Sequence, residues 1–574
     1  MSEENIKNES PNERFEINED GVWFSMPAGK GSIQKIFVCS PLLTLAYARD
    51  ERNTNYCKLL KFFDPDGKPH IWLMPQALLA GDGSELRKTL LSMGLRIGDD
   101  RRAKECLTRY LLSCDPIDRV RTIDRTGWYE QAYVLPEGLI GKQTGEKILF
   151  VGAPLNQPIF HVVGTLEDWQ KRIAARCVGN SRLLFSLSTA FAGPLLGICH
   201  EENGGFHLRG GSSTGKTTCL DVAASLFGGK DYIQRWKATV NGLEATAKMY
   251  NDLLLPLDEM GEINPKDAGE VAYMLGNGVG KSRADKNCDA RAKVKFRCLF
   301  LSTGEISLAQ HMLEDGKKAK AGQETRIADI PADLGLFGVF DHLHEFPDGA
   351  TFSNTLKDSC RECHGTAGPV YIERLSEDFE RVRSIVDAII DTFLERHVPK
   401  GSSGQVKRVG RRFGLVAAGG ELATEYGITG WKKGTPLEAV AKCFEDWLEH
   451  RGDDQDLEEK KILSQVQLFF EMHGESRFSP WDNPADAKTY NRAGFKKSES
   501  SGTEYYVLQE VFKNEICQGC DWRRAAKILV NKKYLKPSSD NKSTRAEQLP
   551  NLGKVRCYRF ERIPIETNET EESK

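Results

Sequence analysis

Residues 21–160 alternate between hydrophobic and polar positions in short runs. The runs at 35–40, 58–63 and 70–75 have the composition and the period of strands, and turn signals separate them. A helical period follows over 84–112. This pattern predicts an N-terminal mixed α/β domain.

Helical and strand-like segments alternate from residue 161 to residue 350. A helical pattern over 166–199 precedes an apolar strand at 205–209, a glycine-rich turn and another helix. Further apolar strands lie at 251–257 and 294–301. The alternation predicts an α/β core.

The remaining third of the chain is helical at first and then mixed. Three amphipathic helices followed by a strand have the order of a winged helix, and they are expected at 461–473, 506–516, 521–532 and 554–560. The sequence thus predicts six segments. They are a disordered tail (1–20), the mixed α/β domain (21–160), the α/β core (161–350), a helical lid region (351–452), a winged-helix-like domain (453–565) and an acidic tail (566–574).

Composition adds little to this division. Of 574 residues, 40% are hydrophobic and 28% are charged, which are ordinary values for a soluble globular protein. The formal net charge of -3 means that binding to nucleic acid would depend on local patches. The longest apolar stretch, 183–199, is shorter than a membrane span of ~20 residues, so a buried helix and no membrane contact are expected. The polar N-terminus and 15 scattered Cys residues favour a reducing cytoplasm.

A phosphate-binding loop lies between the strand at 205–209 and the following helix. The segment fits G-x-x-x-x-G-K-T, and its residues, with the next threonine, are Gly210, Gly211, Ser212, Ser213, Thr214, Gly215, Lys216, Thr217 and Thr218. Glycines let backbone N–H groups surround phosphate oxygens, and the helix N-terminus adds further donors. We expect Lys216 to bind the β- and γ-phosphates of ATP and the Thr217 hydroxyl to bind Mg²⁺.

Acidic residues follow the apolar strand at 251–257, about forty residues after this loop. Asp258 is expected to hold Mg²⁺, and Glu259 is expected to polarise the attacking water. The adjacent pair of acids favours hydrolysis over phosphate transfer to a second substrate. The alternative interpretation is a solvated acidic pair after a core strand.

Two further positions match catalytic elements of AAA+ ATPases. The strand at 296–301 ends in Ser302 and Thr303, one of which would be the sensor 1 residue that orients the water. Arg326 stands where ring ATPases have an arginine finger that enters the neighbouring subunit's site. The alternative for Arg326 is a structural pair with Asp329.

A glycine-rich basic loop lies between the acidic pair and the sensor 1 strand. Its cations include Lys281, Arg283 and Lys286, and it has no apolar period. Such a loop can contact the phosphate backbone of DNA without reading its sequence. A solvated surface loop is the alternative.

Basic residues also occur later in the chain. Arg411 or Arg412 would contact the γ-phosphate if the helix around 405–414 is a lid, although a basic solvated face is an equal alternative. The C-terminal domain is locally basic, which fits either DNA or protein contact. Two C-x-x-C strings, at 360–363 and 517–520, carry little weight as metal or haem sites, so Mg²⁺ is the expected ion.

Several motifs together resemble the family known as domain of unknown function 927. They span 21 to about 370, and they are found at 164–169, 207–218, 241–244, 257–262, 301–305 and 322–326. The family looks like the AAA+ core of the MCM-like, self-loading helicases of mobile cassette chromosomes. This resemblance implies a hexameric ATPase that translocates on DNA during replication of a phage or mobile genetic element.

The sequence therefore predicts an ATP-dependent DNA helicase or translocase. ATP and Mg²⁺ would be its cofactors, and DNA, further copies of the chain and replication proteins would be its partners. The catalytic residues would be Lys216, Glu259 and Thr303 in one subunit and Arg326 from the next. The alternative is a nucleotide-switched loader, initiator or regulator that remodels a protein partner.

Overall fold

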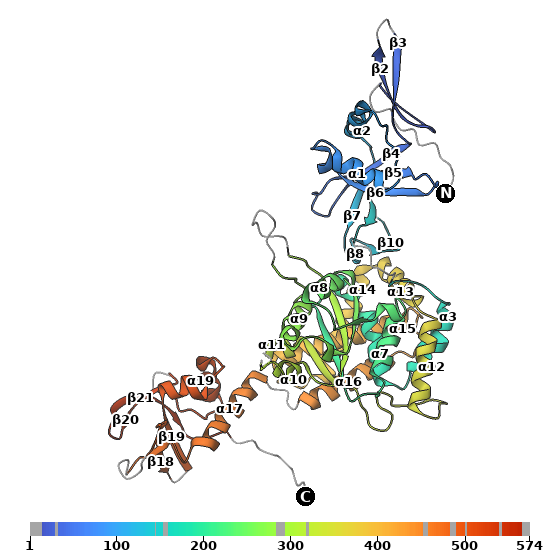
Figure 1. Cartoon of the computed structure of the whole chain (residues 1–574). Helices are drawn as coiled ribbons and strands as arrows, with labels where there is room; N and C mark the ends of the chain where they lie inside the picture. Colours follow the sequence, from blue (N-terminus) through green and yellow to red (C-terminus); the bar gives the residue numbers. More distant parts are fainter. Residues whose placement is uncertain are drawn as a thin grey trace. The chain divides into compact units, whose positions relative to one another are not determined.

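The computed structural model describes residues 14–28, 32–143, 145–152, 159–282, 293–316, 321–451, 457–482, 489–499, 502–538 and 542–564 (Figure 1). The chain forms two compact units. The first contains Met1–Ala319, Arg326–Phe393 and Arg412–Trp447, and the second contains Lys320–Thr325, Leu394–Arg411 and Leu448–Lys574. The segment boundaries expected from the sequence stay predictions, because residues 21–160 and 161–319 belong to one unit.

The first part of the chain is the expected mixed α/β structure. Its elements are β1 (Phe15–Asn18), β2 (Gly21–Ala28), β3 (Ser32–Cys39), β4 (Leu42–Arg49), β5 (Cys57–Phe63), β6 (Pro69–Pro75), η2 (Gln76–Leu79), α1 (Ser84–Ser92), α2 (Arg101–Ser113), β7 (Arg119–Ile123), β8 (Gly127–Tyr129), β9 (Ala132–Leu135), β10 (Gly138–Gly141) and β11 (Lys147–Phe150). The largest sheet has the order β11-β7-β4-β5-β6. Strand β4 alternates buried and half-buried residues, as a sheet with one face on the core requires.

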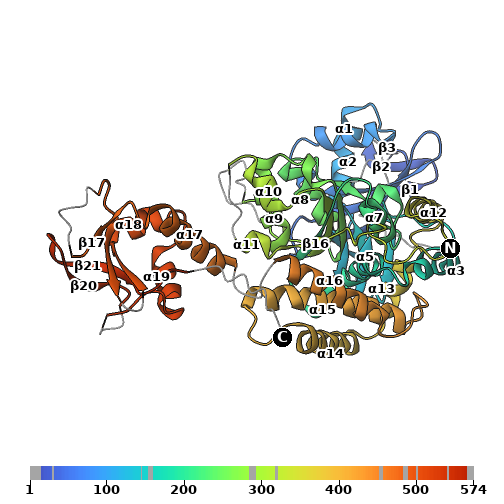
Figure 2. The same ribbon diagram turned by 90° about the horizontal axis from the view of Figure 1, so that it is seen from below.

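A five-stranded sheet forms the centre of the first unit (Figure 2). The elements up to its last strand are α3 (Leu166–Trp169), the π-helical turn η3 (Gln170–Ala174), α4 (Ala175–Cys177), α5 (Ser181–Ala192), α6 (Leu195–Cys199), β12 (Gly204–Arg209), α7 (Lys216–Ala224), η4 (Lys230–Tyr232), β13 (Gln234–Arg235), α8 (Val240–Met249), β14 (Leu253–Asp258), η5 (Met260–Glu262), α9 (Pro265–Asn277), β15 (Cys298–Gly304), α10 (Leu308–Leu313), α11 (Ala321–Glu324) and β16 (Ile327–Pro331). The strands are parallel in the order β13-β14-β15-β12-β16. Their carboxyl ends therefore meet at one edge.

Helices enclose this sheet. Every residue of α5 is buried, so the prediction of a buried helix is confirmed for the first part of the longest apolar stretch, which continues after Gly193 and Pro194 as α6. Long helices follow the last strand, namely α12 (Gly349–Glu362), α13 (Ala367–Glu377), α14 (Phe379–His397), α15 (Gly404–Glu425) and α16 (Thr435–Arg451). The helical character expected for 351–452 is thus confirmed. Among the described residues, no helix has both the length and the hydropathy that a membrane span requires.

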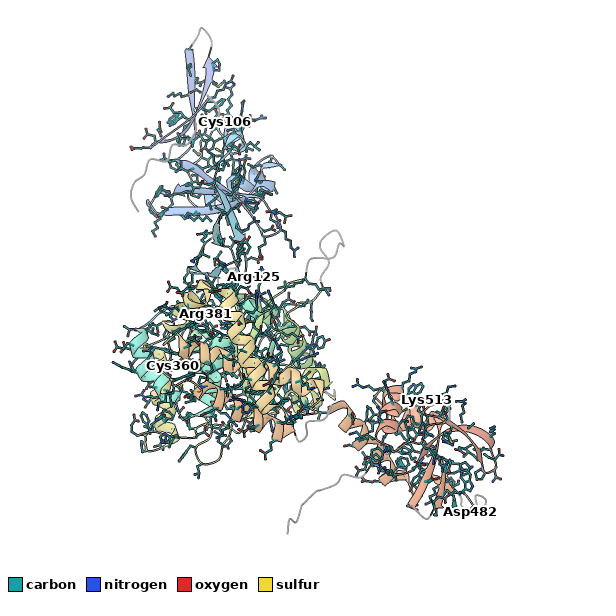
Figure 3. All side chains as sticks on the ribbon, turned by 180° about the vertical axis from the view of Figure 1, so that it is seen from behind. Cys106, Arg125, Cys360, Arg381, Asp482 and Lys513 are labelled. Carbon is teal, nitrogen blue, oxygen red and sulfur yellow. The ribbon has the colours of Figure 1, made fainter. Side chains whose placement is uncertain are left out.

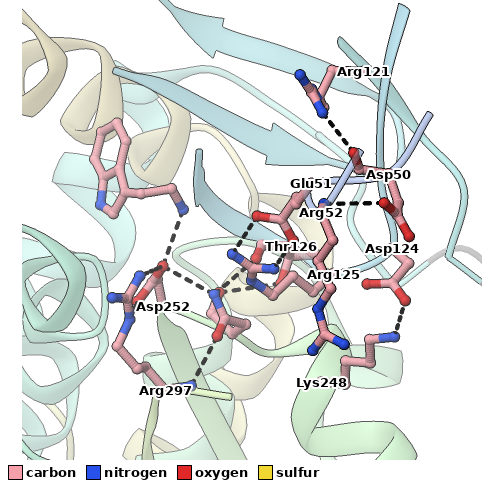
Figure 4. Close-up of polar contacts among 12 residues, drawn as sticks. Asp50, Glu51, Arg52, Arg121, Asp124, Arg125, Thr126, Lys248, Asp252 and Arg297 are labelled. Carbon is pink, nitrogen blue, oxygen red and sulfur yellow. Dashed lines mark hydrogen bonds and ion pairs between the residues drawn. The ribbon is translucent and has the colours of Figure 1, made fainter. Parts of the chain in front are cut away.

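A polar junction joins the N-terminal part of the first unit to the start of strand β14 (Figure 4). Asp252 is fully buried and accepts hydrogen bonds from Arg297 Nε at 2.8 Å and Nη2 at 2.9 Å. The same carboxylate accepts the backbone N–H of Trp128 at 3.0 Å. The Thr126 hydroxyl donates to the carbonyl of Met249 at 2.8 Å. The junction therefore fixes 126–128 against the amino ends of β14 and β15.

Replacement of Asp252 by alanine is expected to lower the free energy of unfolding by about 3–5 kcal/mol, because Arg297 would keep a half-buried charge without its partner. Urea titration of the purified protein measures this change. The control is Lys248→Ala, which removes the more exposed pair with Asp124 and is expected to cost less than about 1 kcal/mol. Equal losses in the two variants would show that Asp252 does not stabilise the junction.

The second unit contains its own sheet of order β17-β18-β19-β21-β20. Its C-terminal elements are α17 (Leu457–His473), β17 (Phe478–Pro480), β18 (Gly494–Glu499), β19 (Gly502–Leu508), α18 (Gln509–Val511), the π-helical turn η6 (Phe512–Ile516), α19 (Trp522–Asn531), β20 (Arg545–Leu549) and β21 (Gly553–Phe560). The helix expected at 506–516 is wrong at its start, because Tyr506 and Val507 lie in β19. Both residues are buried, and both lie in the part of β19 that pairs with β21. Burial of these β-forming side chains outweighs the local helical pattern.

Candidate active site

The expected phosphate-binding loop connects β12 to α7. Its Gly215 has a φ of 94°, and a Cβ there would lie 2.8 Å from Val339 Cγ2, so only glycine fits. Lys216 is buried, and its Nζ donates to the carbonyls of Gly210 at 2.8 Å and Gly211 at 2.5 Å. The loop is thus curled around the lysine ammonium at the amino end of a helix. This arrangement suits a phosphate chain, because the N–H donors and the cation converge on one point.

The two threonines after Lys216 lie in different surroundings. Thr217 is exposed on the first turn of α7. Thr218 is buried, and its hydroxyl is 2.6 Å from the Ser353 hydroxyl of α12. Thr217 is therefore the hydroxyl presented to a ligand, whereas Thr218 contributes to the packing of α12 on α7.

The two acidic residues and the sensor threonine meet at the carboxyl edge of the sheet. Thr303 Oγ1 donates to Asp258 Oδ1 at 2.5 Å, and the Glu259 N–H donates to Thr303 Oγ1 at 3.3 Å. Strand β15 lies between β14 and β12, so Thr303 stands between the acids and the phosphate-binding loop. These contacts bring together residues that the sequence separates by more than forty positions.

The neighbouring Ser302 has a supporting position. Its hydroxyl accepts a hydrogen bond from Trp236 Nε1 at 2.9 Å and lies 2.9 Å from Nδ1 of His207. His207 is buried, and burial lowers its pKa. Of the two residues considered for sensor 1, Thr303 is therefore the one that contacts the acids.

Glu259 has an unusual backbone for a residue with a side chain. Its φ of 57° and ψ of 78° lie in the left-handed region, where strain in non-glycine residues is typical of functional sites. Burial raises the pKa of Glu259, and the nearby charge of Asp258 raises it further, while Lys216 opposes the shift. A carboxylate with a raised pKa is a better proton acceptor, which suits a residue that polarises water.

Asp221 is an acidic residue of the site that the sequence patterns did not reveal. It lies on α7, one helical turn after Thr217, and burial together with the charge of Asp258 raises its pKa to about 6, although Lys357 opposes the shift. The i, i+4 spacing from Thr217 was the available signal, because it places the two residues on one helical face.

The site offers oxygen ligands of the kind that Mg²⁺ prefers. Thr217 contributes a hydroxyl and Asp258 a carboxylate, and Mg²⁺ in nucleotide sites takes its other ligands from water and phosphate. Within the described ranges no group of three or more His, Cys, Asp or Glu side chains could hold a metal by itself. The donor set therefore fits a metal brought by the nucleotide.

Arg326 lies at the opposite edge of the sheet from the phosphate-binding loop. It directly precedes β16, whose Ile327 pairs with Gly205, whereas Pro331 pairs with Arg209 beside the loop. Asp329 forms its ion pair with Arg209, at 3.0 Å, so the pairing with Arg326 considered as the alternative is not formed. Arg326 is therefore remote from the phosphate-binding loop of its own chain.

Arg412 also lies away from the phosphate-binding loop. Its guanidinium is buried beside Gly204 and donates to the Arg326 carbonyl at 3.5 Å. Gly204 is at the amino end of β12, whereas the loop follows the carboxyl end. Arg412 therefore does not reach a γ-phosphate held by the loop of its own chain.

The basic loop begins and ends in an antiparallel stem. Val279 pairs with Lys295, and the Gly280 N–H donates to the Val294 carbonyl at 2.9 Å. At the end of this stem, Lys281 forms an ion pair with Glu270 of α9 at 2.9 Å. Arg283 and Lys286 lie outside the described residues. The expected hairpin is thus present at its base, and its contact with nucleic acid stays a prediction.

The first C-x-x-C string belongs to the packing of α12. Cys360, labelled in Figure 3, is buried, and Cys363 Sγ donates to the Thr165 carbonyl at 3.2 Å. Nδ1 of His364 lies 2.8 Å from the carbonyl oxygen of Cys360. These contacts account for the string as a structural element.

Comparison with known proteins identifies the family. Residues 15–295 match the family described as Domain of unknown function (DUF927). The family inferred from the motifs is thereby confirmed, although the motifs at 301–305 and 322–326 lie beyond the matched residues. No curated protein matches the chain.

Among solved structures, the one described as "SCCmec type IV Cch - active helicase" has a TM-score of 0.70 and 15% identity, and the match covers 97% of this chain and 98% of that one. This likeness shows a common fold over nearly the whole chain. The apo NrS-1 C-terminal region matches at a TM-score of 0.26 and 11% identity over 69% of this chain and 90% of that chain. NtrX from Brucella abortus in complex with ADP matches at a TM-score of 0.17 and 11% identity over 47% of this chain and 50% of that chain. TM-scores this low indicate no common fold for either protein.

Proposed function

We propose that this chain is an ATP-dependent DNA helicase or translocase that works as a ring, with ATP hydrolysed between subunits. The observation that carries the proposal is the contact of Thr303 with Asp258 and Glu259 beside the loop of Lys216. The strand order β13-β14-β15-β12-β16, with the sensor strand between the loop strand and the acidic strand, is the order of AAA+ ATPases. This layout supports hydrolysis of ATP.

Each residue of the edge has a role in this proposal. Lys216 binds the β- and γ-phosphates, and Thr217 and Asp258 hold Mg²⁺. The metal, when bound, neutralises phosphate charge. Glu259 accepts a hydrogen bond from the attacking water, and Thr303 fixes the position of Asp258 and of the Glu259 backbone.

The position of Arg326 supports the ring. A residue at the far edge of the sheet can reach a nucleotide only in a second copy of the chain, and a repeated head-to-tail contact closes into a ring when the rotation between neighbours divides a full turn. A hexamer is the ring size we propose. Arg326 would neutralise charge on the transferring phosphate of the neighbouring site.

Contacts with DNA are assigned to two basic regions. The hairpin that begins at Lys281 would hold a single strand in the ring. In the second unit, residues 457–564 contain 20 Lys and Arg residues against 14 Asp and Glu residues. Arg523, Arg524 and Lys527 are exposed on α19, the helix before the β20–β21 hairpin, as expected of a winged helix that contacts a phosphate backbone.

The biological setting is part of the same proposal. A fold in common with a cassette helicase supports a role in replication of a phage or mobile genetic element, in the cytoplasm and with replication proteins as partners. The first test is the rate of ATP hydrolysis with and without single-stranded DNA, together with opening of a forked duplex. Stimulation and unwinding support the motor. A hydrolysis rate that does not change when DNA is added would favour the loader or remodeller and overturn the proposal.

The hairpin gives a second test. Lys281→Ala combined with Arg283→Ala is expected to abolish unwinding while basal ATP hydrolysis continues, because phosphate contacts are lost far from the nucleotide. A strand-separation assay and a phosphate-release assay measure the two activities. The matched control is Glu270→Ala, which breaks the ion pair of Lys281 and keeps the cations. Unaltered unwinding in the double variant would remove the hairpin from the mechanism.

A further inference from the structure

The side chain of Arg326 is held against the exposed surface of α9. Its Nε and Nη2 donate to Asn277 Oδ1 at 2.9 Å and 2.7 Å. The guanidinium carbon lies 4.2 Å from the centroid of the Tyr273 ring. A cation stacked on an aromatic face gains about 0.5–1 kcal/mol at an exposed site. Two different forces thus act on the same guanidinium.

Gly276 makes room for this arrangement. A Cβ at residue 276 would lie 2.5 Å from Arg326 Cδ and 2.7 Å from its Cβ, so the aliphatic part of the arginine crosses the helix where only glycine fits. Tyr273 is 50% exposed and Asn277 is also exposed. Neither side chain contributes to the core, and both contact Arg326. We call Tyr273, Gly276 and Asn277 the arginine cradle.

We propose that Tyr273 and Asn277 are positioning residues that set the direction of Arg326 toward the nucleotide site of the neighbouring subunit. The inference rests on the proposed function, in which that site is shared between subunits. A long arginine side chain has many rotamers in water, and fixing it beforehand reduces the entropy lost when it meets the phosphate. Tyr273 supplies the stacking plane and Asn277 the hydrogen-bond acceptor that orients the planar fork.

The first measurement is steady-state ATP hydrolysis by the assembled protein. Tyr273→Leu is expected to lower kcat about tenfold and to leave KM within about twofold, because ATP binds to the loop of another subunit. Tyr273→Phe keeps the ring and is expected to retain the activity. Equal kcat in Tyr273→Leu and the wild type would overturn the proposal, and so would an equal loss in Tyr273→Phe.

Mixed assemblies locate the effect on one subunit. A Lys216→Ala subunit has an intact Arg326, and an Arg326→Ala subunit has an intact loop, so mixing two inactive proteins is expected to restore hydrolysis. Adding Tyr273→Leu to the Lys216→Ala subunit is expected to lower the restored rate about tenfold. Adding it to the Arg326→Ala subunit is expected to leave the restoration unchanged.

The outcomes separate two kinds of failure. If the Lys216→Ala and Arg326→Ala proteins do not restore each other, the shared site itself is absent, and the proposed function fails together with the role of Tyr273. If they do restore each other and Tyr273→Leu has the same effect in either subunit, the shared site stands. The arginine cradle then does not position the arginine.

Discussion

Replacement of Arg326 by alanine is expected to reduce ATP turnover by about 10³–10⁵-fold, the range found for arginine fingers in phosphoryl transfer. The reason is electrostatic, because the guanidinium neutralises negative charge that develops on the transferred phosphate. The affinity for ATP should change little, because Lys216 and the backbone of 210–215 bind the nucleotide in another subunit. A phosphate-release assay gives the turnover, and displacement of a fluorescent nucleotide gives the affinity.

The structure offers controls for this prediction. Arg326 is partly exposed and its side chain lies on the surface of α9, so its removal should lower the thermal unfolding midpoint by only a few degrees. Arg209→Ala removes a second arginine of the same sheet, the partner of Asp329, and is not expected to produce the same loss. Normal hydrolysis by the Arg326→Ala protein would show that the site does not depend on a neighbouring subunit.

Replacement of Glu259 by glutamine is expected to lower the hydrolysis rate by about 10²–10⁴-fold while ATP still binds. The amide has the shape of the carboxylate but cannot accept a proton from water. Glu305→Gln is the control, since Glu305 adds to the negative charge around Glu259 without contacting the Asp258–Thr303 pair. A hydrolysis rate in Glu259→Gln close to that of the wild type would exclude Glu259 as the residue that activates water.

The pH dependence of the wild-type rate follows from the same residue. The pKa of Glu259 is raised by burial and by Asp258, so the carboxyl takes up a proton at a higher pH than an ordinary glutamate does. Because the ionised form is the active one, the rate at saturating ATP should fall as the pH is lowered toward this raised pKa. Glu305→Gln removes one of the charges that raise the pKa, so the fall should begin at a lower pH in that variant.

Local patterns predicted much of the fold and of the site. The loop 210–217 follows from the chemistry of its own residues, because glycines and a helix N-terminus are needed within a few positions. The helix over 181–192 and the strand at 253–258 follow from apolar runs. The start of β19 was mistaken for a helix, because a short apolar run has no period that distinguishes the two.

Positions that depend on pairing between distant segments were not predicted from the sequence. Sequence alone favoured Thr303 and kept Ser302 as a second candidate, and the contacts of Ser302 with Trp236 and His207 are seen only in the structure. The placement of Arg412 beneath β12 and the pair of Arg209 with Asp329 likewise result from the order of the strands.

The sequence by itself determined which residues are candidates for binding phosphate and activating water, because those properties belong to residue types at short spacing. The tertiary structure decided which side chains meet. It placed Thr303 between the acids and the loop, set Arg326 at the edge of the sheet opposite the loop, and packed the Arg326 side chain on Tyr273 and Asn277. Sheet order and register make these choices, and they arise from packing across the whole core, which no local run of residues encodes.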